Sequence, residues 1–257
     1  MEESNLLSII LMIVVAMASG LVGTFALMRK MALAADAISH VALPGLGLAI
    51  IYKVDPLLGG GLALILGALF IWIIEKKTSI STETIVGVVF SASLAVGSLV
   101  TPDHELIEAL FGEVKALTFY QAGFGILAAL LVIAFVLWKK NRLALSLISE
   151  DLAIVSGIGV SKLNLLFLLV FSLNVILGLQ FLGVLLMGSL IIVPAVIGRN
   201  LGYSLNSAMV ISVFAAVVSV VGGYFLAGVY NIAVGPTIIS VATGLFFVSF
   251  LRRYIGN

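Results

Sequence analysis

The chain has 257 residues, of which 62% are hydrophobic and 10% are charged, and it contains no cysteine. An average soluble domain has about 45–50% apolar and about 25% charged residues, so this composition excludes an ordinary water-soluble globule. The net charge of +1 comes without a basic tail, which argues against nucleic acid as a partner. The chain is therefore predicted to lie in membrane lipid, and at about 20 residues per spanning helix it has no room for a separate catalytic domain. Any ATP-derived energy would have to come from a partner.

Charges and turn residues divide the chain into nine apolar segments, which predict an all-α polytopic membrane protein with about nine transmembrane helices, eight being the nearest alternative. The stretch between Lys162 and Arg199 is too long for one helix and barely long enough for two, and Gly178–Gln180 is its natural turn. No repeat or linker is visible, so residues 1–257 are expected to form a single transmembrane domain. The predicted spans are residues 6–28, 31–51, 57–74, 84–100, 119–138, 163–178, 181–198, 207–226 and 235–251.

The basic residues predict the orientation, because Lys and Arg in short loops of membrane proteins favour the cytoplasmic side. With the N-terminus outside, 11 of the 13 Lys and Arg residues face the cytoplasm, and only Lys53 and Lys115 do not. The opposite orientation would reverse that count. We therefore predict an external N-terminus and a cytoplasmic C-terminus.

The predicted outer loop over residues 101–118 is acidic. Leu106–Ile107 and Leu110–Phe111 are spaced four residues apart, which predicts a short amphipathic helix on the outer membrane surface. The run Asp103–Glu105 has the residue types of a metal site, but an exposed acidic loop is more commonly just solvated.

Asp36 is the acidic residue that cannot be placed in a loop or at the end of a span. Counting about 1.5 Å per residue from Arg29 puts Asp36 roughly 10 Å inside the hydrocarbon and His40 near its middle. The spacing of four residues places both side chains on one helix face, with Ser39 beside them. Ionisable residues at such depth usually mark a substrate or ion pathway, and a carboxylate with an imidazole can ligate Mn²⁺, Zn²⁺ or Fe²⁺. A hydrogen-bonded packing pair and a proton relay are the alternatives.

Pro44 and Gly45 are candidates for a kink or gate beside this pair. Pro44 has no N–H, so it cannot bond the carbonyl of His40 four residues earlier, and that oxygen could become a third ligand. Gly45 makes a kink easier and lets a neighbouring helix approach closely.

The segment over residues 139–164 is predicted to be cytoplasmic and more structured than a plain loop. Ser149 can cap a short helix over residues 152–156, Gly157–Gly159 can end it, and Ser161 can cap the helix of the next span. Such a pair of helices joined by a glycine turn suits docking to a soluble partner. The alternative is a tight helical hairpin without a partner.

Several stretches, in order along nearly the whole chain, resemble the permease subunits of zinc and manganese ABC importers. These permeases belong to a wider group that includes vitamin B12 and siderophore importers. The resemblance is carried by DAISHVALPG at residues 36–45, LFG at 110–112, EDLAIVSGIG at 150–159 followed by Leu163–Asn164, LGVLLMGSLIIVPA at 182–195 and VGPTI at 234–238.

The resemblance implies a type II ABC importer-like permease bundle in a prokaryotic cytoplasmic membrane. It implies a second copy of the permease in a homodimer, cytoplasmic ABC ATPase subunits that hold the ATP, and an extracytoplasmic metal-binding protein. The chain itself would then be a permease and not an enzyme, with no permanently bound cofactor and with Mn²⁺, Zn²⁺ or Fe²⁺ as cargo. The family's membrane-embedded acid and histidine match Asp36 and His40. Residues expected to couple to the ATPase are Leu147, Glu150, Asp151, Gly157, Gly159 and Lys162.

Two other classes of function compete with this prediction. A proton-coupled secondary metal transporter would use Asp36 and His40 as its proton relay, but it leaves the segment over residues 139–164 without a purpose. An intramembrane metalloprotease needs three protein ligands and a catalytic base. The chain has two histidines, and His104 is predicted outside the hydrocarbon core, so the residues are too few.

Overall fold

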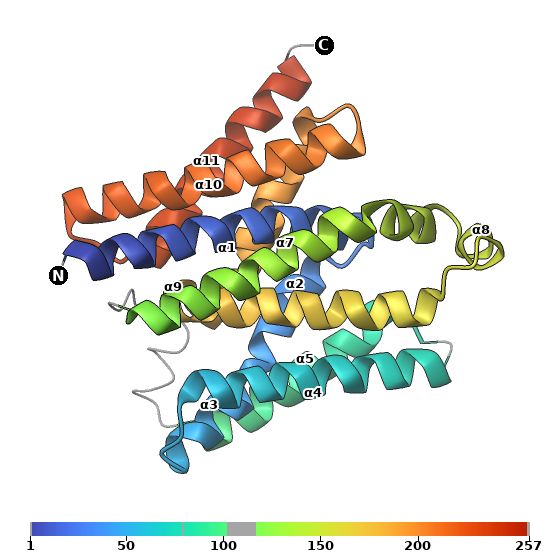
Figure 1. The fold of residues 1–257 in the computed structure, drawn as a ribbon, viewed down its shortest axis with the longest axis horizontal. Helices are drawn as coiled ribbons and strands as arrows, with labels where there is room; N and C mark the ends of the chain where they lie inside the picture. The colour runs from blue at the N-terminus through green and yellow to red at the C-terminus, as the bar shows by residue number, and fades with distance from the viewer. Residues whose placement is uncertain (1, 79, 102–116, 256–257) are drawn as a thin grey trace.

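The computed structural model describes residues 2–78, 80–101 and 117–255, and within these ranges the regular structure is helical (Figure 1). The helices are α1 (Glu2–Met28), α2 (Ala32–His40), α3 (Ala42–Ile51), α4 (Pro56–Lys77), α5 (Thr82–Val100), α7 (Phe119–Ile148), α8 (Glu150–Val155), α9 (Val160–Leu201), α10 (Leu205–Tyr230) and α11 (Val234–Ile255).

Eight helical segments in the described ranges are long and apolar enough to cross a membrane, as judged by length and composition. Two of them, Val160–Leu179 and Leu182–Leu201, are the two halves of α9. This confirms the predicted all-α bundle. The predicted outer-loop helix and the residues Asp103–Glu105 lie outside the described residues.

One predicted span, residues 31–51, is wrong as a single helix. The chain forms α2 and α3 instead, separated at Val41, whose own backbone stays in the right-handed helical region with φ −63° and ψ −19°. Pro44 lies in the first turn of α3, where the missing N–H removes no helical hydrogen bond. Figure 1 shows α2 and α3 following one another diagonally across the bundle.

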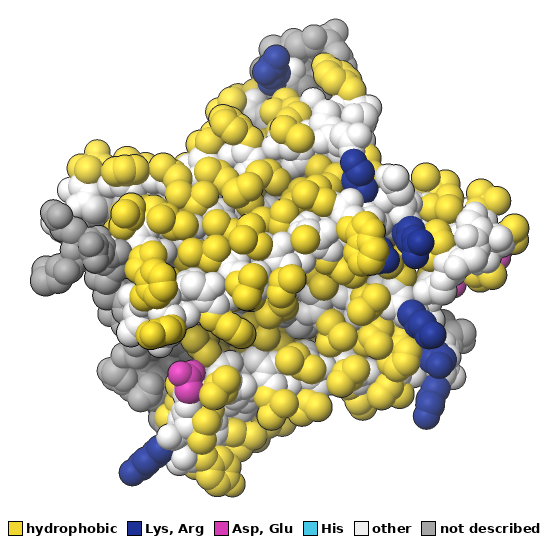
Figure 2. All heavy atoms as spheres, viewed as in Figure 1, with side chains coloured by type: hydrophobic (Ala, Val, Ile, Leu, Met, Phe, Trp, Pro, Cys, Tyr) yellow, Lys and Arg dark blue, Asp and Glu magenta, His cyan; other side chains and the backbone are white. Residues whose placement is uncertain are grey.

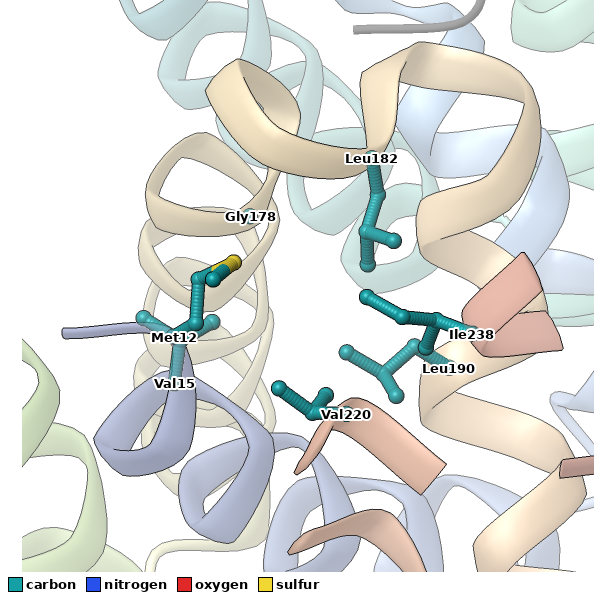
Figure 3. A pocket seen from close by; sticks show the side chains of 7 residues that line it. All are labelled: Met12, Val15, Gly178, Leu182, Leu190, Val220 and Ile238. Atoms are coloured by element: carbon teal, nitrogen blue, oxygen red, sulfur yellow. The ribbon is translucent and has the colours of Figure 1, made fainter. Parts of the chain in front are cut away.

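α9 is the central helix, packed against α1, α2, α4, α7, α10 and α11. It changes direction at Gly183, whose backbone is non-helical with φ 69° and ψ 177°, a conformation that L side chains rarely adopt. The break lies three residues beyond the predicted turn at Gly178–Gln180, which remains helical. A small apolar pocket lies at this bend, lined by side chains of α1, α9, α10 and α11 (Figure 3), and its lining offers no polar group to a ligand.

Charged side chains gather at the ends of the bundle. Figure 2 shows Lys and Arg concentrated toward the end that carries α8, while the middle of the visible face is hydrophobic. Lys53 and Asp55 lie in the turn between α3 and α4. The visible face therefore has a wide apolar middle and one strongly basic end.

Candidate functional site

Asp36 and His40 lie on successive turns of α2, as predicted, but the hydrogen bond between them uses the backbone. The Nδ1 atom of His40 lies 2.9 Å from the carbonyl oxygen of Asp36. Since a carbonyl only accepts, Nδ1 must carry the hydrogen, and in the neutral ring Nε2 then keeps its lone pair. This is the arrangement that holds a metal-binding imidazole in its ligating tautomer. His40 is 6% exposed, so its ring is buried among the packed helices.

Three residues that the sequence did not identify as site residues position this pair. The hydroxyl of Ser39 lies 2.6 Å from the Asp36 carbonyl oxygen and 2.9 Å from that of Val184 in α9. The ring of Phe90 in α5 contacts the His40 imidazole in a T-shaped arrangement, with 5.2 Å between the ring centroids. α2 is thus held against α5 and against the half of α9 that follows the break at Gly183.

Gly188 brings α9 closest to Asp36. A Cβ atom at position 188 would lie 2.6 Å from the Cα of Asp36 and 2.9 Å from its Oδ1. Both distances are shorter than real Cβ contacts, so any side chain here would displace α2. The position falls within the family-like stretch at residues 182–195, but only the fold reveals what it faces.

The pair supplies two ligands from one chain. Across the described parts of the chain, three or more His, Cys, Asp or Glu residues do not come together as a metal site. A first-row divalent cation takes four or more ligands, so the remaining positions would be filled by water, backbone oxygen or a second copy. The assignment of Asp36 and His40 as ligands stays a prediction.

Gly45 lies where α3 and α4 touch, and a Cβ atom at this position would collide with the backbone of Gly59 in α4. The close approach expected from a small residue is therefore present. The gating role of Pro44 and Gly45 stays a prediction.

The segment at residues 139–164 contains a short helix, as predicted, but α8 spans Glu150–Val155 instead of residues 152–156. α7 continues to Ile148, Ser149 caps α8 by accepting a hydrogen bond from Leu152 N at 3.2 Å, and Gly157 adopts φ 74°. The predicted cap at Ser161 is wrong, because Gly159 is the N-cap of α9 and Ser161 lies within its first turn.

α8 presents an apolar surface outside the bundle. Ala153 is fully buried, whereas Leu152 and Ile154 are each 56% exposed and Val155 is 86% exposed. Most of the predicted coupling residues are also exposed: Glu150, Asp151, Gly157, Gly159 and Lys162, with Leu147 partly buried against the core. Their role in coupling stays a prediction.

A polar network that sequence reasoning missed joins the end of α1 to α4, α5 and α9. Arg29, directly after α1, donates from Nη1 to Asn164 Oδ1 in α9 at 2.8 Å, and its guanidinium lies 4.5 Å from the ring centroid of Phe167. Glu75 Oε1 in α4 accepts from Asn164 Nδ2 at 3.4 Å and from Thr82 Oγ1 in α5 at 2.6 Å.

Burial lowers the pKa of Arg29 to about 10, with the nearby Glu75 carboxylate acting in the opposite direction. Because this pKa remains well above neutral pH, Arg29 stays charged in the cell. A charged group held this far out of water needs the partners that surround it.

Residues 2–253 match the ABC 3 transport family. The chain is 28% identical to the high-affinity zinc uptake system membrane protein ZnuB of Haemophilus influenzae, over 94% of each protein. It is 32% identical to the manganese transport system membrane protein MntC of Listeria innocua, over 95% of this chain and 89% of that protein.

Two solved structures are similar in fold. PsaBC from Streptococcus pneumoniae, in complex with a Fab, superposes with a TM-score of 0.82 at 28% identity, over 95% of this chain and 89% of that one. An inward-facing putative metal-chelate type ABC transporter gives a TM-score of 0.71 at 17% identity, over 96% and 85% of the two chains, and supports the fold alone.

Proposed function

The chain belongs to the ABC 3 transport family, and we propose that it is the permease of an ATP-driven importer that carries Mn²⁺ or Zn²⁺ into a bacterial cell. It is a membrane-spanning subunit, and ATP hydrolysis belongs to a separate subunit. Fe²⁺ accepts the same ligand types and is a third possible cargo.

The observation that carries this proposal is the Asp36–His40 pair. Its imidazole donates through Nδ1 to the Asp36 carbonyl, which leaves Nε2 available for a cation in a buried position between spanning helices. A carboxylate with an imidazole binds first-row divalent ions with moderate strength, which suits a site that must also release its ion.

We infer an alternating-access cycle around this pair. An extracytoplasmic binding protein would release the cation into an outward-open cavity, where Asp36 and His40 of two permease copies form its transient ligands. ATP-driven movement of the partner subunits, passed through α8, would then close the outer side and open the inner side.

The orientation proposed for this cycle places α8 in the cytoplasm. The end of the bundle that carries α8 is the one where Lys and Arg gather (Figure 2), in keeping with the positive-inside rule. The exposed apolar residues of α8 would then face a groove on the ATPase, with the N-terminus of the chain outside.

The decisive experiment reconstitutes the permease with its ATPase and binding protein in liposomes and measures ATP-driven uptake of Mn²⁺ and Zn²⁺. Asp36→Asn and His40→Ala are each expected to lower uptake at least about tenfold while the ATPase still co-purifies, because each removes a ligand. Asp55→Asn is the matched control, since Asp55 is an exposed helix cap and Asn caps equally well.

Normal uptake by both ligand variants would contradict the ligand assignment. Transport by the permease alone under a proton gradient would instead favour a proton-coupled carrier.

A further inference from the structure

We propose that Arg29 and Asn164 are coupling residues that transmit movement of the ATPase-docking helix α8 to α2, the helix that carries Asp36 and His40. The inference rests on the proposed function and adds a physical connection between its two ends. It is carried by the network of Arg29, Glu75, Thr82, Asn164 and Phe167, called here the four-helix network.

The side-chain amide of Asn164 is the centre of the four-helix network because it uses both of its ends. Arginine only donates hydrogen bonds, so the atom that faces Arg29 must be the amide oxygen. A carboxylate only accepts, so the atom that faces Glu75 must be the amide nitrogen. The distances of 2.8 Å and 3.4 Å match this assignment. Neither Asp nor Leu at position 164 could make both bonds.

Asn164 moves with α8 because little chain separates them. α8 ends at Val155, a short turn containing Gly157 follows, and α9 begins at Val160. The first turn of α9 is also fixed to α4, since the indole Nε1 of Trp72 lies 2.8 Å from the carbonyl oxygen of Ser161. A movement of α8 therefore also moves the start of α9, which is packed against α4.

Arg29 stands at the other end of the connection, in the turn between α1 and α2: its N–H donates to the carbonyl oxygen of Phe25 in α1 at 3.0 Å, and α2 begins at Ala32. The chain turns at Lys30, whose φ is 58°. The buried Met31 is the N-cap of α2, and Ile38 follows it by seven residues in that helix, with His40 two residues further on. The guanidinium contacts Asn164 and the buried ring of Phe167, which lie three residues apart on one face of α9. Arg29 thus cannot keep both contacts if the start of α9 moves away from the turn that leads into α2.

The energetics favour a coupling role over simple stabilisation. Arg29 Nε is buried without a hydrogen-bond partner among the described residues. The free-energy cost of burying this charge offsets much of the stabilisation that its contacts contribute. An apolar side chain could hold these helices together without that penalty. A set of directional bonds instead fixes one relative arrangement of α4, α5, α9 and the end of α1 that leads into α2, which is what a coupled movement requires.

The test measures ions transported per ATP hydrolysed by the reconstituted complex of permease, ATPase and binding protein, with Mn²⁺ as the probe. Asn164→Leu keeps the number and branching of the side-chain heavy atoms and removes both bonds. It is expected to leave ATP hydrolysis within about twofold of the unmodified complex and to lower the number of ions per ATP at least about tenfold. Asn206→Leu is the matched control, because Asn206 is an exposed asparagine bonded to Lys140 at 3.0 Å and lies outside the four-helix network.

Arg29→Lys covers the case in which Asn164→Leu fails to assemble. It keeps the positive charge but not the planar fork that contacts Asn164 and Phe167, so a partial loss of about threefold in ions per ATP is expected. An unchanged ratio in the assembled variants would overturn the inference. Absence of ATP-driven uptake by the unmodified complex would overturn the proposed function, and the inference with it.

Discussion

At the scale of single residues, the backbone of α2 decides what the His40 imidazole can do. One helical turn places the ring against the carbonyl oxygen of Asp36, and that contact selects the tautomer with a free Nε2. Because the ring bonds the carbonyl oxygen, the Asp36 carboxylate does not have to accept its hydrogen bond and stays available to a cation. The hydroxyl of Ser39 then holds the same turn to the carbonyl of Val184 in α9.

Gly188 gives a residue-scale prediction. Gly188→Ala is expected to lower metal uptake about tenfold or more, because its Cβ would lie 2.6 Å from the Cα of Asp36 and a shift of α2 misplaces both ligands. Uptake by the reconstituted complex measures the effect. Gly228→Ala in α10 is the matched control, since a Cβ there meets no atom within 4 Å, and its uptake should equal that of the unmodified protein. Equal uptake by both variants would contradict the close contact at Gly188.

At the scale of elements, α8 is a helix that cannot be stable by itself. Six residues are far below the length at which isolated helices form in water, so α8 depends on its cap at Ser149, the turn at Gly157 and the buried Ala153. These features hold it at a fixed position with its apolar residues outward. Exposed apolar residues on a structured helix are typical of a docking surface.

α8 gives the element-scale prediction. Ile154→Asp is expected to weaken co-purification of the ATPase at least about tenfold, because a carboxylate would replace an exposed apolar side chain at the proposed contact. The folding of the permease should not change. Ile232→Asp, between α10 and α11, is the control, because Ile232 is 53% exposed and lies away from α8 in the sequence. Retention of the ATPase by Ile154→Asp would show that it docks elsewhere.

The division of residues 31–51 shows what a pattern of apolar residues leaves open. The run is continuous and long enough for one span, so it predicts one. The separation into α2 and α3 accompanies packing that no local pattern contains: Gly45 lies against Gly59 of α4, and Leu43 lies against Gly97 of α5. Such contacts join residues distant in sequence, so they require the fold.

At the scale of the whole molecule, one chain would supply half of the proposed cation site, and ATP hydrolysis belongs to a separate subunit. If two copies share one ion, Mn²⁺ should bind the purified permease with one ion per two chains, since Asp36 and His40 of each copy supply four ligands together. Equilibrium binding followed by metal analysis measures this ratio. His40→Ala should reduce the bound metal, whereas one ion per chain in the unmodified protein would contradict the shared site.

The sequence alone determined the membrane location, the helical class, the family resemblance and the Asp36–His40 pair. These follow from composition and from spacings within one helix, which are local properties. Only the tertiary structure decided where α9 breaks, which atom of Asp36 meets His40, that Gly188 and Phe90 contact the pair, and that the residues of the four-helix network come together. The physical reason is that these features depend on close packing and hydrogen bonds between helices far apart in the chain, and a linear pattern does not specify which helix faces are neighbours.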